Sequence, residues 1–361
     1  MKEILILGGG RVGSAIAYDL CTAYSVTVAD INESTLKKLT QNYNVKTTQC
    51  DCSNSNELKE IIRTYDLIIS AVPGFMGFET LKTIIENNKS VVDISFFPEN
   101  ALELNELAKQ HNVTALVDFG VAPGLGNILF GHYDTLMDIN SYECYVGGLP
   151  KEKTPPFQYK APFSPIDVIE EYTRPARLFK NYKIITQDPL TDLEIIKFET
   201  NEDLEAFNTD GLRSLLFTMS HIPDMKEKTL RYPGHAELIQ KLKNEGLFHP
   251  DVVKNTAEKL KKEWFLEEGE EEFTVMRIII KSKKKNIQID LYDEYHKKTK
   301  ITSMARTTGY TCTAGANLLI NKTFDKKGVF PPELVGKDVN SYQFIINYLK
   351  EREIILKTTN K

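Results

Sequence analysis

Short apolar runs alternate with amphipathic stretches through the first 120 residues of the chain. The first run, at residues 4–7, is continuously apolar, which is typical of a parallel strand that is buried on both faces. The later runs have the same character, and helical stretches such as 55–64 and 77–87 separate most of them. The later strand candidates are residues 26–29, 45–48, 67–71, 90–94 and 114–117. The alternation predicts a doubly wound parallel sheet.

The pattern changes near residue 125. Five prolines between residues 150 and 165 predict a long irregular loop, because proline removes backbone hydrogen-bond donors. Residues 273–282 and 286–292 alternate apolar and polar positions, which predicts antiparallel neighbours joined by the lysines at 283–285. The acidic stretch at 267–272 and this lysine run are interpreted as solvated turns.

The end of the chain carries two further apolar patterns, at residues 311–322 and 341–352, which predict buried helices. We expect them to pack on the first sheet, so that the middle of the chain forms an inserted domain. The predicted fold is α/β: a Rossmann-type doubly wound parallel sheet with an inserted mixed α/β (α+β) domain for substrate binding and dimerisation. The expected limits are 1–124 for the first domain, 125–305 for the insertion and 306–361 for the returning segment.

Glycines follow the first strand at the spacing of a dinucleotide-binding loop, and a helical stretch follows them directly. Gly8 permits the tight turn, Gly10 leaves the backbone open to a diphosphate, and Gly13 lets the helix lie close to the strand. The N-terminus of the helix offers N–H groups and a partial positive charge to the phosphates. Arg11 and Val12 complete this candidate site. A glycine-rich turn without a ligand is the alternative.

Asp30 ends the second predicted strand, where an acidic side chain accepts hydrogen bonds from the adenosine ribose. Its charge would repel a 2′-phosphate, and residues 31–33 supply no cation, so the sequence favours NAD over NADP. A turn or a helix cap is the alternative for Asp30. Asp51 follows the third strand and could approach the adenine or cap the next helix. Residues that leave room for the cofactor end the fourth strand: Ala71, Val72 and Pro73.

Length and charge narrow the classes of function. At ~150 residues per domain, the 361 residues correspond to roughly two domains. The formal net charge of −5 leaves no basic excess, which argues against nucleic-acid binding as the main role. No apolar run approaches the ~20 residues of a membrane span, and the N-terminal run is too short for a signal peptide. We therefore expect a cytoplasmic protein that binds no membrane.

Cysteine usage agrees with that expectation. The five cysteines are scattered and are interpreted as reduced thiols. Cys50 and Cys52 have no partner pair at zinc-site spacing, so we expect no metal site.

Further segments of the sequence carry a more specific signal. They are DFGVAPGLGN (118–127), GGLP (147–150), FSP through EYTRP (163–175), FNTDGL (207–212), TLRYPGH (229–235) and SMARTTGY (303–310). Together with the glycine loop they resemble the saccharopine dehydrogenase superfamily, and within it the lysine 6-dehydrogenase (lysine ε-dehydrogenase) branch. The similar saccharopine-forming members tend to carry an acidic residue before the first Pro-Gly. This chain has Ala122 there, which favours the lysine-oxidising branch.

The resemblance implies a nicotinamide cofactor, a small-molecule amino-acid substrate and hydride transfer from the carbon that bears an amine. In a lysine 6-dehydrogenase, NAD oxidises the ε-amine carbon of L-lysine. The imine then hydrolyses with loss of ammonium, and the semialdehyde cyclises to piperideine carboxylate. Such chemistry needs a base that deprotonates the ε-ammonium and a cation that binds the substrate carboxylate.

Candidates for the catalytic work lie in the segments that carry the resemblance. Arg231 is the candidate for binding the carboxylate, and His235 is the candidate acid–base group, with structural roles as the alternatives. Asp210 could hold the substrate amine or cap a helix that begins at Gly211. Asp118 could steer the nicotinamide or simply close a strand.

Four further residues are candidates for contact with the ligands. Arg306 could bind a carboxylate, a phosphate or a domain interface. Tyr145 and Tyr172 are candidate walls of the substrate site, although most tyrosines simply pack. Gly124 would let backbone amides approach the nicotinamide, and it also suits a tight turn before a helix near residue 127.

Two other functions remain open at this point. A saccharopine-type reductase would join an amino acid to an oxo acid, and a non-catalytic NAD-binding sensor would need little beyond the first 125 residues. A homo-oligomer, as a dimer or a dimer of dimers, is expected because antiparallel strands expose an edge that another subunit can cover.

Overall fold

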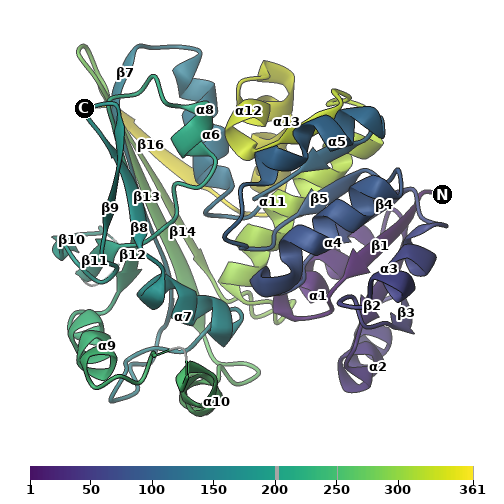
Figure 1. Ribbon diagram of the computed structural model, residues 1–361, viewed down its shortest axis with the longest axis horizontal. Coiled ribbons are helices and arrows are strands. Elements are labelled where there is room, and N and C mark those ends of the chain that lie inside the picture. Colours follow the sequence, from purple (N-terminus) through teal and green to yellow (C-terminus); the bar gives the residue numbers. More distant parts are fainter. Residues whose placement is uncertain (200–202, 250, 361) are drawn as a thin grey trace. The chain divides into compact units, whose positions relative to one another are not determined.

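The computed structural model describes residues 1–199, 203–249 and 251–360, and Figure 1 labels its elements. The contacts between residues divide the chain into two units. The first unit comprises Met1–Leu136 and Ala305–Glu353, and the second comprises Met137–Met304 and Ile354–Lys361. The domain limits drawn from the sequence, after residues 124 and 305, stay a prediction.

One parallel sheet forms the centre of the first unit. Its strands are β1 (Glu3–Leu7), β2 (Ser25–Asp30), β3 (Lys46–Gln49), β4 (Leu67–Ser70), β5 (Val91–Asp93), β6 (Thr114–Leu116) and β15 (Gly328–Phe330). They lie in the order β15-β6-β5-β4-β1-β2-β3, and all neighbours are parallel. The order 3-2-1-4-5-6 within this sheet is that of a Rossmann fold. The predicted doubly wound sheet is therefore confirmed.

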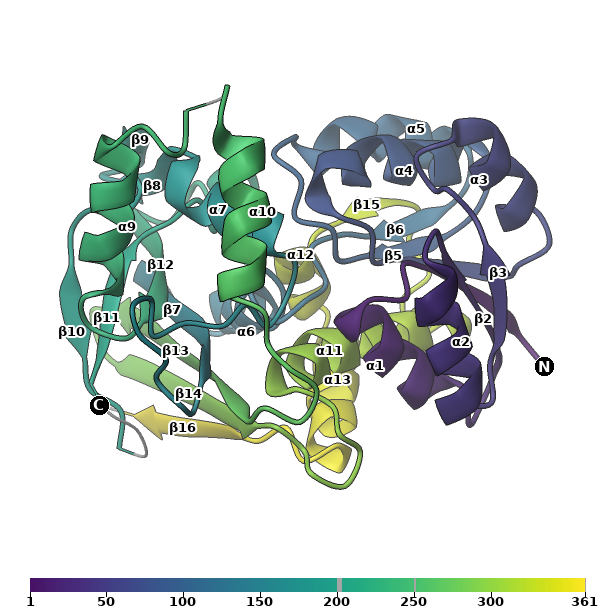
Figure 2. The same ribbon diagram turned by 90° about the horizontal axis from the view of Figure 1, so that it is seen from below.

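Helices cover both faces of this sheet. They include α1 (Arg11–Leu20), α2 (Glu33–Asn42), α3 (Ser55–Ile62), α4 (Gly74–Glu86), α5 (Asn105–Gln110) and α6 (Leu125–Asp134), with a 3-10 turn at Ala101–Leu104. Figure 2 shows α3, α4 and α5 on one face, and α1 and α2 on the other. Asn32 and Asn54 cap α2 and α3, because their side chains accept hydrogen bonds from amides of the first turn.

The C-terminal segment returns to the first unit through α11 (Ser303–Ile320), α12 (Pro332–Gly336) and α13 (Val339–Glu351). Asp19 of α1 anchors this segment. Its carboxylate accepts hydrogen bonds from the Thr313 hydroxyl, from Tyr348 at 2.7 Å and from Arg352 Nε at 2.7 Å. The two helices predicted near the end of the chain are confirmed, although α11 begins before residue 311.

A mixed sheet forms the second unit. Its strands are β7 (Ile139–Pro150), β8 (Ala176–Lys180), β9 (Lys183–Gln187), β10 (Glu194–Ile196), β11 (Leu204–Asn208), β12 (Asp224–Arg231), β13 (Glu272–Ser282), β14 (Asn286–Glu294) and β16 (Leu356–Asn360). The main order is β10-β11-β12-β7-β13-β14-β16. In it β7 and β12 are parallel and the other neighbours are antiparallel. The predicted antiparallel pair is confirmed as β13 and β14. The last strand, β16, joins this sheet, so the final residues depart from the expected return to the first domain.

Helices pack on one face of the mixed sheet. They are α7 (Pro165–Thr173), α9 (His235–Asn244) and α10 (Val253–Glu263). The short helix α8 (Leu215–Thr218) precedes β12 along the chain. An apolar cluster around Trp264 joins α7, α9 and α10 to Phe207 of β11. Trp264 is completely buried, and Tyr172 of α7 lies in the same cluster. Of the site residues predicted in the second unit, this cluster holds Tyr172 in place.

Two loop predictions have different outcomes. Residues 151–164 contain no regular helix or strand, as the prolines predict, and the lysines at 283–285 are exposed. Glu272, however, is not part of a solvated turn. It begins β13, is buried, and accepts hydrogen bonds from the amide of Ser303 and from the Ser303 hydroxyl, the latter at 2.6 Å. The carboxylate is buried because it caps the first residues of α11, and burial raises its pKa to about 7.

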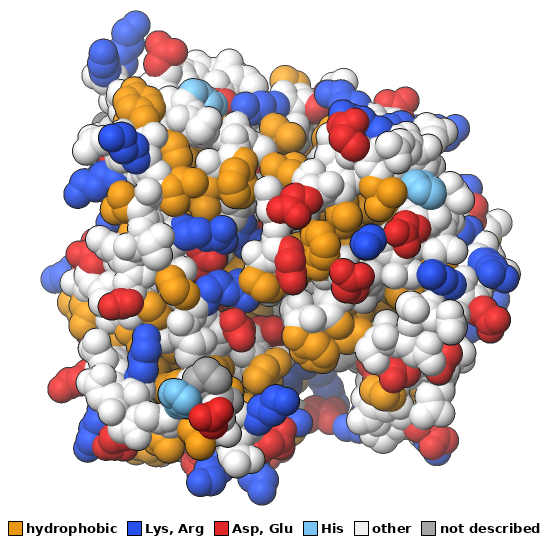
Figure 3. All heavy atoms as spheres, in the orientation of Figure 1, with side chains coloured by type: hydrophobic (Ala, Val, Ile, Leu, Met, Phe, Trp, Pro, Cys, Tyr) orange, Lys and Arg blue, Asp and Glu red, His pale blue; other side chains and the backbone are white. Residues whose placement is uncertain are grey.

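Charge is evenly spread on the face drawn in Figure 3, where acidic and basic side chains are interspersed. That distribution agrees with the small net charge of −5. In the three described ranges, no helix combines the length and the apolar character that crossing a membrane requires.

Candidate functional site

The glycine loop of the first unit lies between β1 and α1. Gly8 has a positive φ of +98°, and a Cβ there would lie 2.5 Å from the carbonyl oxygen of Ala71. A Cβ on Gly13 would lie 2.0 Å from the carbonyl oxygen of Gly8. Around Gly10, by contrast, a Cβ would meet nothing within 4 Å. Two of the glycines are thus required by close packing, and the third leaves space beside the helix.

The backbone at the N-terminus of α1 borders the open space beside Gly10. Gly10 is the N-cap, and no side chain caps the helix there. Arg11 and Val12 are the first helical residues. Because the N-terminal amides and the helix dipole favour anions, this end of α1 fits the diphosphate of a dinucleotide.

Asp30 is held at the end of β2 by two backbone amides. Its carboxylate oxygens accept hydrogen bonds from Gly9 N at 2.7 Å and from Asn32 N at 2.7 Å. Each oxygen retains a further lone pair, so the carboxylate can still accept from ribose hydroxyls. Ile31, which follows directly, is 64% exposed and offers an apolar surface next to Asp30 in the sequence.

Asp51 does not cap the helix that follows it. Asn54 is the N-cap of α3, whereas Asp51 accepts hydrogen bonds from the amide and hydroxyl of Ser53 at 2.9 and 2.6 Å. These bonds lower the pKa of the Asp51 carboxyl. The contact with adenine stays a prediction.

The end of β4 lies beside the glycine loop. Ala71 N donates to Leu7 O of β1 at 2.9 Å, and Val72 is buried. Pro73 is the N-cap of α4, so the chain turns into a helix immediately after the strand. Ala71, Val72 and Pro73 therefore stand where the two central strands end, which is where this fold binds its ligand.

Gly124 is needed for a close turn. It has φ +144°, and a Cβ there would lie 1.8 Å from the carbonyl oxygen of Gly120. The following residues form α6, in agreement with the helix predicted near residue 127. The turn accounts for glycine at this position, and its contact with a nicotinamide stays a prediction.

A buried carboxyl that sequence reasoning missed lies at the end of β5. Asp93 is completely buried and accepts hydrogen bonds from Ser95 N at 3.1 Å and Ser95 Oγ at 2.9 Å. Burial raises its pKa to about 7, and the nearby charge of Asp118 adds to this effect. Asp118 itself follows β6, is buried and has a positive φ of 55°. The signal that pointed to Asp30, an acidic residue at the end of an apolar run, was present at Asp93 as well.

In the second unit, three of the predicted residues form one chain of hydrogen bonds. Arg231 Nε donates to the Tyr172 hydroxyl at 3.2 Å, and that hydroxyl lies 3.0 Å from His235 Nε2. His235 Nδ1 lies 2.8 Å from the carbonyl oxygen of Phe157. Since a carbonyl can only accept, Nδ1 carries the proton and Nε2 accepts from Tyr172.

Burial explains the electrostatics of this chain. Arg231 is 2% exposed, and its Nη2 donates to Glu171 Oε2 at 2.6 Å. Burial raises the pKa of Glu171, and the charge of Arg231 opposes that rise. Burial together with the charge of Arg231 lowers the pKa of His235 to about 3. His235 is therefore neutral at physiological pH, and Arg231 is matched by an internal carboxylate.

Two other predicted residues are also committed to partners in their own units. Asp210 binds Arg177 in a bidentate pair, with Nε and Nη2 each at 2.8 Å from a carboxylate oxygen. No helix begins at Gly211, so the cap suggested for Asp210 is not formed. Arg306 donates from Nη2 to the carbonyl oxygen of Arg352 at 3.0 Å.

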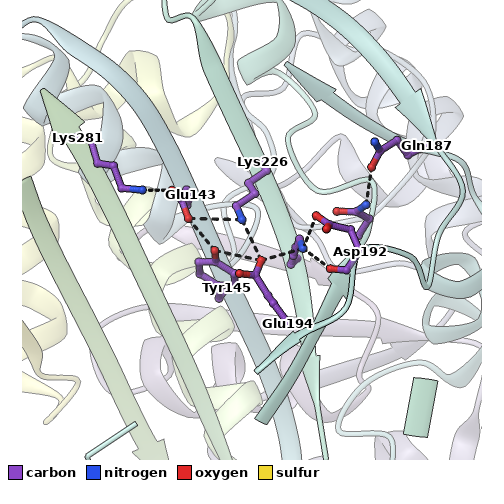
Figure 4. A network of polar contacts seen from close by, with 9 residues as sticks. Glu143, Tyr145, Gln187, Asp192, Glu194, Lys226 and Lys281 are labelled. Atoms are coloured by element: carbon purple, nitrogen blue, oxygen red, sulfur yellow. Dashed lines mark hydrogen bonds and ion pairs between the residues drawn. The ribbon is translucent and has the colours of Figure 1, made fainter. Parts of the chain in front are cut away.

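Tyr145 lies on the opposite face of the mixed sheet from Arg231. Tyr145 pairs in register with Lys228 of β12, and strand side chains alternate between the faces. Figure 4 shows Tyr145 within a network of ion pairs, where its hydroxyl donates to Glu143 at 2.7 Å. Lys226 binds Glu194 at 2.9 Å in the same network. The structure therefore brings Arg231, Tyr172 and His235 together and separates Tyr145 from them.

Potential metal ligands do not cluster. Within residues 1–199, 203–249 and 251–360, no group of three or more His, Cys, Asp or Glu side chains could hold a metal ion. All five cysteines are free thiols.

Two family models together match nearly the whole chain. Residues 4–116 match the saccharopine dehydrogenase NADP binding domain, and residues 120–355 match the saccharopine dehydrogenase C-terminal domain. The glycine loop and Asp30 lie in the first matched range, and the hydrogen-bonded residues Arg231, Tyr172 and His235 lie in the second.

Curated relatives are similar to this chain at low identity. The mitochondrial alpha-aminoadipic semialdehyde synthase of Mus musculus is 24% identical over 267 residues, which are 70% of this chain and 29% of that protein. The NADP+-dependent, L-glutamate-forming saccharopine dehydrogenase of Saccharomyces cerevisiae is 24% identical over 269 residues, which are 70% of this chain and 59% of that protein. The chain thus matches less than two thirds of the length of these relatives.

Solved structures share the fold. The apo L-Glu-forming saccharopine dehydrogenase from Saccharomyces cerevisiae has a TM-score of 0.79 at 18% identity, with 100% of both chains covered. The homospermidine synthase of Legionella pneumophila, in complex with NAD, has a TM-score of 0.74 at 14% identity, with 100% of this chain and 91% of that chain covered.

Proposed function

Because the chain belongs to the saccharopine dehydrogenase family, we propose that it is a nicotinamide-dependent oxidoreductase that acts on the CH–NH2 group of an amino acid. The observation that carries the proposal is the glycine loop, where Gly10 leaves open space at the uncapped N-terminus of α1. When bound, the nicotinamide ring accepts a hydride from the carbon that bears the amine. The protein's part is to bind and orient the cofactor and substrate.

The choice of NAD over NADP rests on Asp30. A carboxylate at this position accepts from ribose hydroxyls and repels a 2′-phosphate. The next residues, Ile31, Asn32 and Glu33, add no positive charge. The matched family model is named for NADP, so the affinity of the protein for both cofactors is the deciding measurement. We expect tighter binding of NAD, and a gain in NADP affinity in Asp30→Ala.

For the substrate we propose L-lysine, oxidised at the ε-carbon, with ammonium released after hydrolysis of the imine. Ala122 supports this choice, because the resembling saccharopine-forming members tend to carry an acidic residue there. Arg231 and His235 enter the proposal as positioning residues, since their polar atoms bond to partners inside the second unit. The base that deprotonates the ε-ammonium is not assigned to either of them.

A saccharopine-type reductase is the second candidate. The names of the curated relatives favour it, because the yeast relative is a saccharopine dehydrogenase. That reaction would consume reduced cofactor only when an amino acid and an oxo acid are present together.

The experiment mixes the purified protein with NAD and L-lysine at alkaline pH and follows the absorbance of the reduced cofactor. L-Ornithine and saccharopine are assayed separately as alternative substrates, and the reverse assay supplies reduced cofactor with L-lysine or L-glutamate and an oxo acid. Gly10→Val is the matched control, because a Cβ at this position meets nothing within 4 Å and the larger side chain would occupy the space left for the diphosphate. Formation of reduced cofactor with lysine as the sole substrate supports oxidation of the ε-amine of lysine. Turnover of saccharopine but not of lysine supports the saccharopine-type reductase. Absence of turnover under every condition would contradict both.

A further inference from the structure

Asp93 occupies the half of the first sheet that binds nicotinamide in Rossmann folds. It is the last residue of β5, and it pairs in register with Ser70 of β4. Such sheets consist of two mononucleotide-binding halves, and ligands bind outside the carboxyl ends of the strands. Strands β1–β3 carry the glycine loop and Asp30, so β4–β6 form the half for the nicotinamide mononucleotide. Asp93 therefore lies at the end of the middle strand of that half.

The hydrogen-bond partners of Asp93 are neutral serine groups. Its carboxyl oxygens accept from the amide and hydroxyl of Ser95, and Ser70 donates a further hydrogen bond. In the part of the chain that the structure describes, Asp93 forms no ion pair. The nearby titratable groups are Asp118 after β6, which is acidic, and the buried thiol of Cys312 on α11. The side of α4 nearest to Ser95 contributes Gly77.

A completely buried carboxylate without a cationic partner is costly to ionise. Three neutral donors stabilise the anion, but burial dominates and raises the pKa of Asp93 to about 7. The group is thus poised between its two forms at physiological pH. A positive charge placed nearby would favour the anion, and removal of that charge would favour the acid.

We propose that Asp93 is the counter-charge of the oxidised nicotinamide ring, and that it takes up a proton when the ring is reduced. This inference rests on the proposed function. With the cofactor bound, transfer of a hydride (two electrons and one proton) from the substrate carbon would cancel the positive charge that Asp93 balances. A solvent proton then bonds to a carboxylate oxygen of Asp93, with no further electrons involved. Asp93 acts through its charge and is a positioning residue for the oxidised cofactor.

The test measures the dissociation constants of NAD+ and NADH for the full chain between about pH 6 and pH 8. In the wild type, we expect the preference for NAD+ over NADH to rise about tenfold with pH, the equivalent of about one pKa unit. Asp93→Asn should lose this pH dependence and keep the low-pH preference at every pH. Glu86→Gln removes an exposed carboxylate from the same unit and should retain the wild-type pH dependence.

A second variant and a direct proton count cover the case in which Asp93→Asn does not fold. Ser95→Ala removes a donor to the carboxylate, so the rise in NAD+ preference should move to higher pH. In weak buffer near pH 7, the wild type should release protons when it binds NAD+ and not when it binds NADH.

The outcomes separate the two proposals. A pH-independent preference in the wild type, or unchanged pH dependence in Asp93→Asn, would overturn the inference while cofactor binding stands. If neither cofactor binds, the proposed function fails and this inference fails with it.

Discussion

Replacing Arg231 with methionine separates a structural role from a substrate-binding role. The Arg231 side chain is 2% exposed and donates to Glu171 at 2.6 Å, to Tyr172 at 3.2 Å and to the carbonyl oxygen of Leu230 at 2.9 Å. Methionine retains an apolar stem of similar length and removes the charge and all of these donors. The change therefore leaves the largely buried carboxylate of Glu171 without its cation.

The expected magnitude follows from that unpaired carboxylate. Breaking a buried ion pair by removing one partner costs about 3–5 kcal/mol, because the remaining charge stays desolvated. A typical domain is stable by only about 5–15 kcal/mol, so this loss is a large part of the total. Because the Glu171 side chain is 18% exposed, we expect the free energy of unfolding of Arg231→Met to fall by about 3 kcal/mol at neutral pH, the lower end of that range.

The loss should depend on pH. Burial raises the pKa of Glu171, and without the charge of Arg231 that pKa rises further. A folded-state pKa above the unfolded value penalises folding above the unfolded pKa, and the penalty disappears as the pH falls below it. The destabilisation of Arg231→Met should therefore be largest near pH 7 and shrink below about pH 5.

Urea unfolding followed by circular dichroism measures both effects. The double variant Arg231→Met/Glu171→Gln should recover at least half of the lost stability, because no buried charge is left unpaired. Lys151→Met serves as the control, since the side chains of Lys151 and Glu294 are 34% and 45% exposed and such a pair should contribute about 1 kcal/mol or less. Wild-type stability in Arg231→Met, combined with a raised KM for the amino acid, would refute the structural reasoning.

Three further predictions test the glycine loop, His235 and Tyr145. Gly10→Val should fold with wild-type stability and lose cofactor affinity in a calorimetric titration. Gly13→Val should lose stability as well, because a Cβ at this position would lie 2.0 Å from the carbonyl oxygen of Gly8. Because the pKa of His235 is depressed in the folded state, its contribution to stability is present above about pH 6.5 and is lost as the pH falls, by up to about 1.4 kcal/mol per pH unit. In acid unfolding, His235→Gln should reduce this dependence of the unfolding free energy on pH, and an unchanged dependence would contradict the prediction. Tyr145→Phe removes the hydrogen bond to Glu143 and should cost about 1 kcal/mol of stability without changing KM, and a raised KM would place Tyr145 at the substrate.

Local patterns predicted most of the first unit. The apolar runs gave the central strands of the parallel sheet, and their alternation with helices gave its type. Gly8 and Gly13 could be identified because each meets backbone that lies close along the chain or on the neighbouring strand. These features depend on short-range geometry, which spacing in the sequence preserves.

Contacts between distant segments could not be predicted in this way. The pair of Arg231 with Glu171 joins β12 to α7, and the face on which Tyr145 lies depends on the parallel register of β7 and β12. Nothing local sets that register. The same limit applies to Glu272. The acidic run around it predicted a solvated turn, whereas in the structure its carboxylate is buried and binds Ser303 at the start of α11.

The most direct test of the proposed reaction follows the hydrogen that is transferred. L-Lysine deuterated at the ε-carbon is incubated with the protein and NAD+, and the reduced cofactor is examined by mass spectrometry. We expect one deuterium in the nicotinamide ring and the appearance of piperideine carboxylate. Reduced cofactor without deuterium, or intact deuterated lysine with a protein that binds NAD+, would contradict it.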